Sequence, residues 1–353
     1  MSLATNSQIS VVDLFCGAGG LTRGFLDAGL DVVGGFDLDP SCRFAYEANN
    51  AVPFFEQDAE LLSGETLSAL YNKGTVRVLA GCAPCQPFSN YTQGPKRLSR
   101  DDQRWNMLVE FLRLVRAVMP EIVCMENVPQ LHAKSAFRDF FSGLVELGYA
   151  VEAEVLDCTA FEVPQMRKRL TLLASLRGRI KIPVSSGSQT PRTVRETIAH
   201  LPRIDAGGSC RTDRLHRCMG LSKTNKLRIG QSRPGGTWKD WDDELVLPCH
   251  KKFSGRGYGG VYGRMEWDKP APTITTQCLF YGSGRFGHPE QDRAISLREA
   301  ALLQTFPEDY HFFCETRSIA QRDIARFIGN AVPVKVGKAL AVRIAEHVTE
   351  HYC

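Results

Sequence analysis

Short apolar segments rich in β-branched residues alternate with longer amphipathic segments through the first half of the chain. The strand-like segments span residues 9–15, 31–36, 52–56, 76–81 and 121–125, followed by 150–157 and 170–176. In other segments, which end at Gly29, Pro120 and Gly148, apolar residues recur every three or four positions, as in helices. This alternation predicts an α/β fold with a doubly wound, mostly parallel sheet.

The pattern changes between about residue 202 and residue 293, where Gly, Arg, Lys and aromatic residues become frequent and helical periodicity is absent. Helical patterns return at 296–306, 318–328 and 333–352. We therefore expect three parts. They are a catalytic and cofactor-binding domain at 1–190, a smaller domain at 191–312, and a C-terminal segment at 313–353 that returns to the first domain.

Glycine-rich or polar groups follow each of the first five predicted strands. They are CGAGG (16–20), DLDP (37–40), Asp58, CAPCQPFS (82–89) and ENVP (126–129). In open α/β sheets, ligands bind beyond the carboxyl ends of the strands. Gly17, Gly19 and Gly20 allow a tight turn, and Asp37, 20 residues after Gly17, suits hydrogen bonds from a ribose. Thr22 departs from the dinucleotide fingerprint, so we expect an adenosine-type ligand that need not carry a pyrophosphate. The alternative is a glycine turn that only packs strand on helix.

The segment GCAPCQPFS contains a Cys-x-x-Cys spacing at Cys82 and Cys85. It can belong to a zinc site, a redox pair, a structural loop, or a single nucleophile with a neighbouring thiol. The other candidate zinc ligands, Cys210, Cys218, Cys249 and His250, have irregular spacing, so we expect no metal. We favour Cys85 as a nucleophile beside a bound adenosine cofactor, with Cys82 as a buried neighbour.

Five motifs occur in order along the chain: DLFCGAGG, PCQPFS, MENV, QMRKR and IGNAVPV. Together they resemble the motifs of the cytosine-C5 DNA methyltransferases, from about residue 10 to residue 345. The resemblance implies a Rossmann-like, S-adenosylmethionine-dependent methyltransferase fold. It also implies that the Gly- and Arg-rich region after QMRKR is a target-recognition domain.

The resemblance implies three catalytic roles, and the chemistry requires them. C5 of cytosine is a poor nucleophile, and a thiolate that adds to C6 activates it, a role that falls on Cys85. The addition places negative charge on the ring, which Glu126 can relieve by supplying or sharing a proton at N3. Arg169, with Arg167 in support, matches the cation that holds the base near O2.

For the cofactor, the resemblance implies S-adenosylmethionine, with S-adenosylhomocysteine as the product. Phe15 packs on it, the glycines hold its methionine end, Asp37 binds the ribose and Asp58 binds the adenine amino group. Leu38 stands where the family often has a larger residue against the adenine. The complete implied set is Phe15, Gly17, Gly19, Gly20, Asp37, Leu38, Asp58, Pro84 and Asn330.

The implied substrate is a specific duplex DNA sequence, from which the target base must be flipped. The segment after Cys85 reads as a loop that closes over this base, with Lys96, Arg97 and Arg100 near phosphates. The smaller domain offers further backbone and groove contacts at Lys251, Lys252, Phe253, Arg256, Tyr258, Tyr262 and Arg264. We expect core packing for Trp238, Trp241 and Trp267.

Bulk properties limit the alternatives. A net charge of +4 permits a nucleic-acid partner without requiring one, and no apolar run is long enough to span a membrane. Twelve cysteines without an export signal favour reduced thiols in the cytoplasm. We expect a monomer from a bacterial restriction–modification system whose nuclease is not a stable subunit. The alternatives are the same chemistry on RNA such as tRNA, a DNA-binding protein with an inactive site, and a nicotinamide oxidoreductase.

Overall fold

The computed structural model describes residues 8–84, 106–183, 190–255, 257–314 and 319–352, which form two compact units. The first unit comprises Met1–Phe161, Lys168–Gly187 and Val332–Cys353. The second comprises Glu162–Arg167 and Ser188–Ala331. The chain therefore leaves the first unit twice, and it returns for the last time with its C-terminal segment.

A seven-stranded sheet forms the centre of the first unit, with the strand order β3-β2-β1-β4-β5-β8-β6. Strands β1 to β5 run parallel, whereas β8 is antiparallel to both of its neighbours, β5 and β6. The strands are β1 (Ile9–Leu14), β2 (Asp31–Asp37), β3 (Phe54–Glu56), β4 (Val76–Gly81), β5 (Ile122–Asn127), β6 (Ala150–Asp157) and β8 (Lys168–Ser175). The predicted doubly wound, mostly parallel sheet is confirmed.

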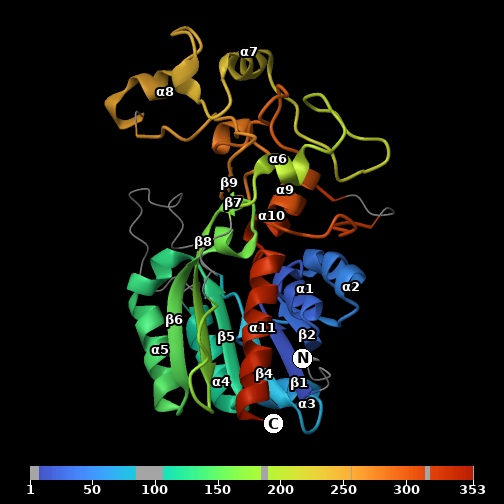
Figure 1. Ribbon diagram of the computed structural model, residues 1–353, viewed down its shortest axis with the longest axis vertical. Coiled ribbons are helices and arrows are strands. Elements are labelled where there is room, and N and C mark those ends of the chain that lie inside the picture. The colour runs from blue at the N-terminus through green and yellow to red at the C-terminus, as the bar shows by residue number, and fades with distance from the viewer. Residues whose placement is uncertain (1–7, 85–105, 184–189, 256, 315–318, 353) are drawn as a thin grey trace. The chain divides into compact units, whose positions relative to one another are not determined.

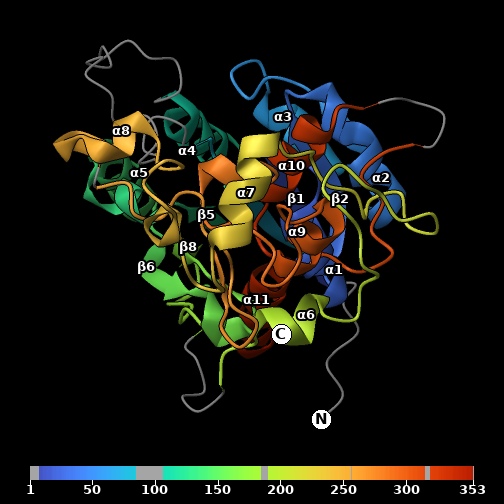
Figure 2. The same cartoon turned by 90° about the horizontal axis from the view of Figure 1, so that it is seen from above.

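Helices cover both faces of this sheet, as Figure 1 and the view from above in Figure 2 show. Helices α1 and α11 lie on one side and α4 and α5 on the other, while α2 packs on α1 and α3 on α4. The helices are α1 (Gly20–Asp27), α2 (Arg43–Asn50), α3 (Gly64–Leu70), α4 (Asn106–Val118), α5 (Ser135–Glu146) and α11 (Val334–His351), with 3₁₀ turns at Pro40–Cys42, Pro129–Ala133 and Cys158–Phe161.

Burial explains which of these elements could be predicted. Every residue of β1 and β5 is buried, as expected for central parallel strands covered on both faces, and these strands read as continuous apolar runs. Helices α2 and α3 were not predicted. They are 8 and 7 residues long, so neither presents more than about two turns of apolar periodicity.

The C-terminal helix α11 is part of the first unit because it packs closely against α1. A Cβ atom added at Gly24 of α1 would lie 2.5 Å from the backbone oxygen of Val334 in α11, so only glycine fits there. Helix α10 (Gln321–Asn330) instead belongs to the second unit, where Gly329 lies against the backbone of Thr275. The returning segment thus begins at Val332 in this division, later than the expected residue 313.

The second unit is mostly irregular, as its sequence predicted. Its helices are α6 (Val194–Ile198), α7 (Lys223–Gln231), α8 (Pro248–Lys251), α9 (Leu297–Leu303) and α10, its strands are β7 (Gln165–Met166) and β9 (Ala271–Pro272), and its 3₁₀ turns are Trp238–Asp240, Phe253–Gly255 and Tyr281–Ser283. Helix α7 was not predicted. Trp238 and Trp241 are buried in its apolar cluster, which confirms their expected place in the core.

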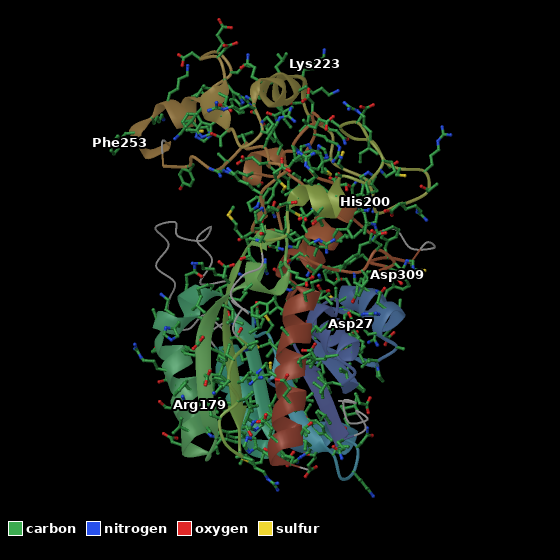
Figure 3. The ribbon with its side chains drawn as sticks, viewed as in Figure 1. Asp27, Arg179, His200, Lys223, Phe253 and Asp309 are labelled. Carbon is green, nitrogen blue, oxygen red and sulfur yellow. The ribbon has the colours of Figure 1, made fainter. Side chains whose placement is uncertain are left out.

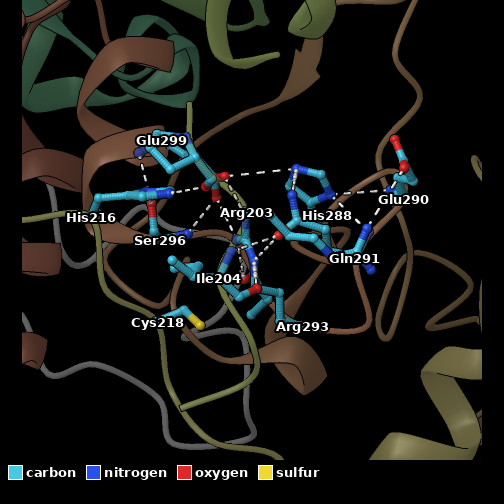
Figure 4. Close-up of polar contacts among 12 residues, drawn as sticks. Arg203, Ile204, His216, Cys218, His288, Glu290, Gln291, Arg293, Ser296 and Glu299 are labelled. Atoms are coloured by element: carbon cyan, nitrogen blue, oxygen red, sulfur yellow. Dashed lines mark hydrogen bonds and ion pairs between the residues drawn. The ribbon is translucent and has the colours of Figure 1, made fainter. Parts of the chain in front are cut away.

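A buried polar network organises the second unit (Figure 4). Arg293 donates to both carboxylate oxygens of Glu299, each at 2.7 Å, and both side chains are 1% exposed. Glu299 also accepts from the backbone N–H of Ser296, closing the capping box of α9. His288 lies 3.7 Å from Glu299, and burial lowers the pKa of His288 to about 4. The imidazole is therefore neutral at pH 7.

Three further findings concern the ranges that the structure describes. None of the helices there is both long and apolar enough to cross a membrane. The cysteines there are free thiols. No group of three or more His, Cys, Asp or Glu side chains there is placed to hold a metal ion.

Candidate functional site

The parallel strands β1 to β5 bring their carboxyl ends, and the loops that follow them, to one edge of the sheet. The strand order reverses between β1 and β4, because the chain builds β2 and β3 on one side of β1 and β4 and β5 on the other. Such a switch point leaves a crevice between the diverging loops. The predicted groups at the strand ends are therefore gathered at this edge.

The loop after β1 has the backbone conformation of a ligand-binding turn. Phe15, Gly17 and Gly19 have φ angles of 57°, 51° and 87°, all in the left-handed region that favours glycine. A non-glycine residue in this region is strained, and such strain concentrates at functional sites. A Cβ atom added at Gly17 would meet no protein atom within 4 Å, so space remains beside this residue.

Asp37 at the end of β2 is held by the glycine loop. The backbone N–H of Gly17 donates to Asp37 Oδ2 at 2.8 Å, and the N–H of Asp39 donates to Oδ1 at 2.9 Å. Each carboxylate oxygen has two lone pairs, so these bonds fix the group and still allow it to accept from a ligand. The sequence predicted Asp37 as a ligand acceptor but not its link to Gly17.

The remaining predicted cofactor residues of the first unit lie in the loops that follow their strands. Leu38, directly after β2, is 65% exposed, which leaves its apolar surface open to a ligand. Asp58, after β3, is half-buried and accepts from the N–H of Glu60 at 3.0 Å. Pro84, after β4, is exposed. None of these three is fixed in the way that Asp37 is.

Beneath the glycine loop lies a buried carboxyl group that sequence reasoning missed. Asp13 in β1 is 1% exposed and accepts from the Thr22 hydroxyl at 2.6 Å, and that hydroxyl is also 3.1 Å from the Tyr46 hydroxyl. Burial raises the pKa of Asp13 to about 7, and the Asp37 charge contributes to this rise. An acidic residue inside an otherwise apolar strand was the available signal.

Glu126 is the penultimate residue of β5, and groups from both neighbouring strands bind it. Arg169 of β8 approaches with Nε 2.8 Å from Oε1, and the Cys82 thiol, just after β4, donates to Oε2 at 2.8 Å. The Glu126 side chain is 2% exposed and that of Arg169 is 13% exposed. Cys82 was expected to be a buried bystander; instead it is half-buried and bonded to Glu126.

Asn127 connects the two loops at this point. Its amide donates to the Ala83 carbonyl at 3.0 Å, and its side-chain oxygen accepts from the N–H of Val128 at 2.9 Å. It therefore joins the end of β5 to the loop after β4, in line with the expectation that Asn127 shapes the loop. The loop that begins at Cys82 is thus anchored immediately before Cys85.

Several predicted residues are not part of this group. Cys85, Lys96, Arg97, Arg100 and Arg256 lie outside the described residues. Arg167 belongs to the second unit and is 2% exposed, with its guanidinium donating to the carbonyls of Ile274 and Ala331. Asn330 is the last residue of α10, also in the second unit. The roles predicted for Arg167 and Asn330 stay predictions.

One predicted DNA contact is wrong. Arg264 is 5% exposed, and its guanidinium donates to the carbonyls of Ile229, His288 and Gln291 and pairs with Asp292. Buried charges require such bonds, so this arginine stabilises the second unit from inside. Lys252, Phe253 and Tyr258 are exposed and so remain available for contact.

The described site thus combines two kinds of chemistry. The glycine loop and Asp37 present a fixed carboxylate beside open space. The group of Cys82, Glu126 and Arg169 holds a carboxylate between a thiol donor and a guanidinium, next to the loop that carries Cys85. A carboxyl group so placed can exchange a proton with a bound substrate, and the guanidinium can stabilise negative charge.

The comparisons with known proteins agree over nearly the whole chain. The family model for C-5 cytosine-specific DNA methylases matches residues 9–346. The chain is 50% identical over 339 residues to the Type II methylase M.HgiDII of Herpetosiphon aurantiacus, covering 95% of this chain and 94% of that protein. It is 31% identical to the Type II methyltransferase M1.HphI of Haemophilus parahaemolyticus, covering 95% of this chain and 86% of that protein.

The fold is also similar to that of solved structures. A DNA modification methyltransferase encoded within an E. coli prophage aligns with a TM-score of 0.73 at 21% identity, covering 97% of this chain and 99% of that chain. This likeness concerns the fold.

Proposed function

Because the chain belongs to the family of C-5 cytosine-specific DNA methylases, we propose that it transfers a methyl group from S-adenosylmethionine to C5 of a cytosine within a specific duplex DNA sequence. The chain is thus a DNA (cytosine-5)-methyltransferase. The family match favours DNA over the alternative of RNA. The nicotinamide oxidoreductase alternative is excluded by the same match.

The observation that carries this proposal is the placement of Glu126. The carboxylate sits at the carboxyl end of β5, within bonding distance of Arg169 Nε and the Cys82 thiol. It is next to the anchored loop that leads into Cys85. An acid, a cation and a nucleophile-bearing loop at one sheet edge are what addition to a pyrimidine ring requires.

The first unit fits the cofactor that the family resemblance implies. S-adenosylmethionine supplies an electrophilic methyl group on a sulfonium. The open space beside Gly17 suits its methionine part, and the carboxylate of Asp37, already fixed by Gly17, accepts from the ribose hydroxyls. Phe15 would pack on the cofactor, Leu38 and Asp58 would lie at its adenine end, and Pro84 is a further member of the implied set. Asn330 is the member of that set that lies in the second unit.

In the proposed mechanism, the Cys85 thiolate adds to C6 of a flipped cytosine and forms a covalent adduct. The addition makes the C5 carbon nucleophilic toward the methyl group that S-adenosylmethionine would supply. Once C5 carries the methyl group, loss of the C5 proton to solvent and departure of the Cys85 thiolate restore the C5–C6 double bond. Glu126 shares a proton with N3 while negative charge develops on the ring. Arg169 holds the carbonyl oxygen O2 and keeps Glu126 in position, with Arg167 in support as the resemblance implies.

We propose that the second unit recognises the DNA sequence. Its exposed Lys252, Phe253 and Tyr258 suit contact with backbone and grooves, whereas the buried Arg264 only maintains the unit. The named relatives are Type II enzymes, so we place this chain in the modification half of a restriction–modification system. It acts as a monomer, and its nuclease is not a stable subunit.

Bisulfite sequencing of a plasmid from cells that express the protein tests this function. We expect protected cytosines confined to one short motif in the wild type. The Cys85→Ala variant should leave those cytosines unprotected, and Glu126→Gln should protect only a small fraction of them. Cys210→Ser, which removes a partly exposed thiol of the second unit, is the matched control and should protect the same motif.

Three outcomes would contradict the proposal. Protection by Cys85→Ala equal to that of the wild type would exclude the covalent mechanism. An absence of protection in the wild type, together with methyl transfer from labelled S-adenosylmethionine to tRNA, would make RNA the substrate. Binding of a labelled duplex without any methyl transfer would indicate an inactive DNA-binding protein.

A further inference from the structure

Cys82 has no role in the mechanism above, yet its thiol contacts the carboxylate that the mechanism needs. The Cys82 Sγ atom lies 2.8 Å from Glu126 Oε2. In this bond the thiol S–H donates and the carboxylate oxygen accepts. The bond therefore connects an uncharged donor to the proton-exchanging residue.

The geometry of the sheet makes this bond one half of a clamp. In the strand order, β5 lies between β4 and β8. Arg169 comes from β8 and approaches Oε1 from one side, while Cys82 follows β4 and approaches Oε2 from the other side. Among the described residues, Oε1 thus has an ion pair with Arg169 but no hydrogen bond, whereas Oε2 accepts a hydrogen bond from Cys82. The bond from Cys82 is therefore the one that orients the carboxylate.

The environment strengthens such a bond. The Glu126 side chain is 2% exposed, so water does not compete for its oxygens as it would at the surface. Cys82 is itself tied to the sheet, because its backbone N–H donates to the Leu14 carbonyl of β1. A donor attached to two strands in this way arrives at Glu126 from a fixed direction.

We infer that Cys82 is a positioning residue for methyl transfer, whose thiol orients the Glu126 carboxylate toward the cytosine. This inference rests on the proposed function. It separates the two cysteines of the GCAPCQPFS segment: Cys85 bonds covalently to the base, and Cys82 acts only through Glu126. It also means that removing the Cys82 thiol impairs the chemical step without impairing cofactor or DNA binding.

Single-turnover methylation of a duplex carrying the motif found by bisulfite sequencing tests the inference. Because a thiol is a weak donor, loss of its bond to the Glu126 carboxylate in Cys82→Ala should slow methyl transfer about tenfold. Cys82→Ser, which keeps a donor, should recover most of this loss. The dissociation constants for S-adenosylmethionine and for the duplex should stay within about twofold of wild type in both variants.

A double-mutant cycle separates positioning from a merely structural effect. If Cys82 acts through Glu126, adding Cys82→Ala to Glu126→Gln slows the reaction much less than the tenfold seen in the wild-type background. An unchanged rate in Cys82→Ala, or equal tenfold losses in both backgrounds, would overturn the inference. A Cys82→Ser variant as slow as Cys82→Ala would do the same.

The control variant keeps this test distinct from a failure of the proposed function. Cys210→Ser removes a partly exposed thiol in the second unit and should match the wild-type rate. An inactive wild type and an inactive Cys210→Ser would refute the function itself. If the wild type and the control variant are active and Cys82→Ala is as active as they are, only the role of Cys82 is refuted.

Discussion

Asp13 illustrates how one buried residue links the sheet to the ligand loop. Its carboxyl group lies inside β1, bonded to Thr22 of α1, and Thr22 in turn contacts Tyr46 of α2. The three side chains join the first strand to α1, which directly follows the glycine loop, and to α2. Burial, rather than a salt bridge, controls the charge of this carboxyl group.

The first prediction concerns the pH dependence that Asp13 causes. Its pKa is about 7 in the folded protein, against an ordinary value of 3.8. The folded state therefore retains a proton that the unfolded state releases between pH 4 and 7, so stability falls as pH rises through this window. This loss of folding stability amounts to a few kcal/mol at pH 8 and is absent below pH 4.

The Asp13→Asn variant removes this titration. We expect the free energy of unfolding of the variant minus that of the wild type to increase by about 2–4 kcal/mol between pH 4 and pH 8. Urea titrations at each pH measure this difference. Asp27→Asn changes an exposed aspartate of α1 and should show no such trend. A constant difference between Asp13→Asn and wild type across this range would contradict the prediction.

At the scale of elements, the crossing of α1 and α11 depends on one glycine. A Cβ at Gly24 would lie 2.5 Å from the Val334 oxygen and 2.6 Å from the Lys338 nitrogen, both backbone atoms that cannot move independently. Gly24→Ala should therefore destabilise the protein by about 2 kcal/mol or more, measured by urea unfolding followed by far-UV circular dichroism.

Gly230 provides the matched control for this substitution. It is an exposed helical glycine of α7, and a Cβ there would have only the Asp292 carboxylate nearby, at 3.8 Å. Gly230→Ala should leave stability unchanged or raise it by about 0.5–1 kcal/mol, because alanine favours the helix. Equal effects of the two substitutions would mean that the helix crossing relaxes around the added methyl group.

The segment of α8 and the 3₁₀ turn after it presents an exposed aromatic side chain. Phe253 is 91% exposed, and Figure 3 shows it projecting from this segment. The segment is held from behind by the stacking of Trp238 on His250, with ring centroids 4.6 Å apart. A fixed base and an exposed aromatic ring beside Lys252 suit contact with nucleic acid.

We expect Phe253→Ala to weaken binding of a duplex carrying the recognition motif by about tenfold, measured by fluorescence anisotropy, because a lost aromatic contact costs about 1–3 kcal/mol. Its thermal stability should stay at the wild-type value, since the ring packs against little protein. Leu227→Ala, at an exposed apolar position of α7, is the control and should bind normally. Unchanged affinity in Phe253→Ala would exclude this segment from the DNA interface.

At the scale of the whole molecule, the two units differ in what stabilises them. The first has a large apolar core around its sheet, whereas the second relies on buried polar groups such as the Arg293–Glu299 pair. Paired buried charges cost much when one partner is altered. The second unit should therefore be the more sensitive to acid.

His288 gives the pH window of this sensitivity. Its pKa is about 4 when folded and 6.5 ordinarily, so the unfolded state takes up a proton first as pH falls. The second unit should lose about 3 kcal/mol between pH 6.5 and pH 4. Trp238, Trp241 and Trp267 lie in this unit and Trp105 lies in the first, so tryptophan fluorescence measured in a Trp105→Phe background during urea unfolding reports on the second unit.

His288→Gln should remove most of this pH dependence, even if it lowers stability at pH 7. His200→Gln, at a half-exposed side chain of the same unit, is the control and should show the same pH dependence as the wild type. A fluorescence midpoint of the otherwise wild-type protein that stays constant from pH 6.5 to pH 4 would contradict the prediction.

The sequence by itself determined the sheet, the set of groups at its edge and the family. Strand and helix periodicity are local properties of buried elements, so β1 to β5 could be located, and parallel strands necessarily gather their carboxyl ends. Short helices such as α2, and the mostly irregular second unit, carry too little periodicity for their elements to be located in the same way.

Only the tertiary structure decided which side chains meet. The thiol of Cys82 and the carboxylate of Glu126 are 44 residues apart, and their contact depends on the order of β4, β5 and β8 in the sheet. The sequence pattern also placed Arg264 among the DNA-contacting cations, although it is buried by residues more than 20 positions away. Burial and partner choice arise from packing between distant segments, which local pattern does not record.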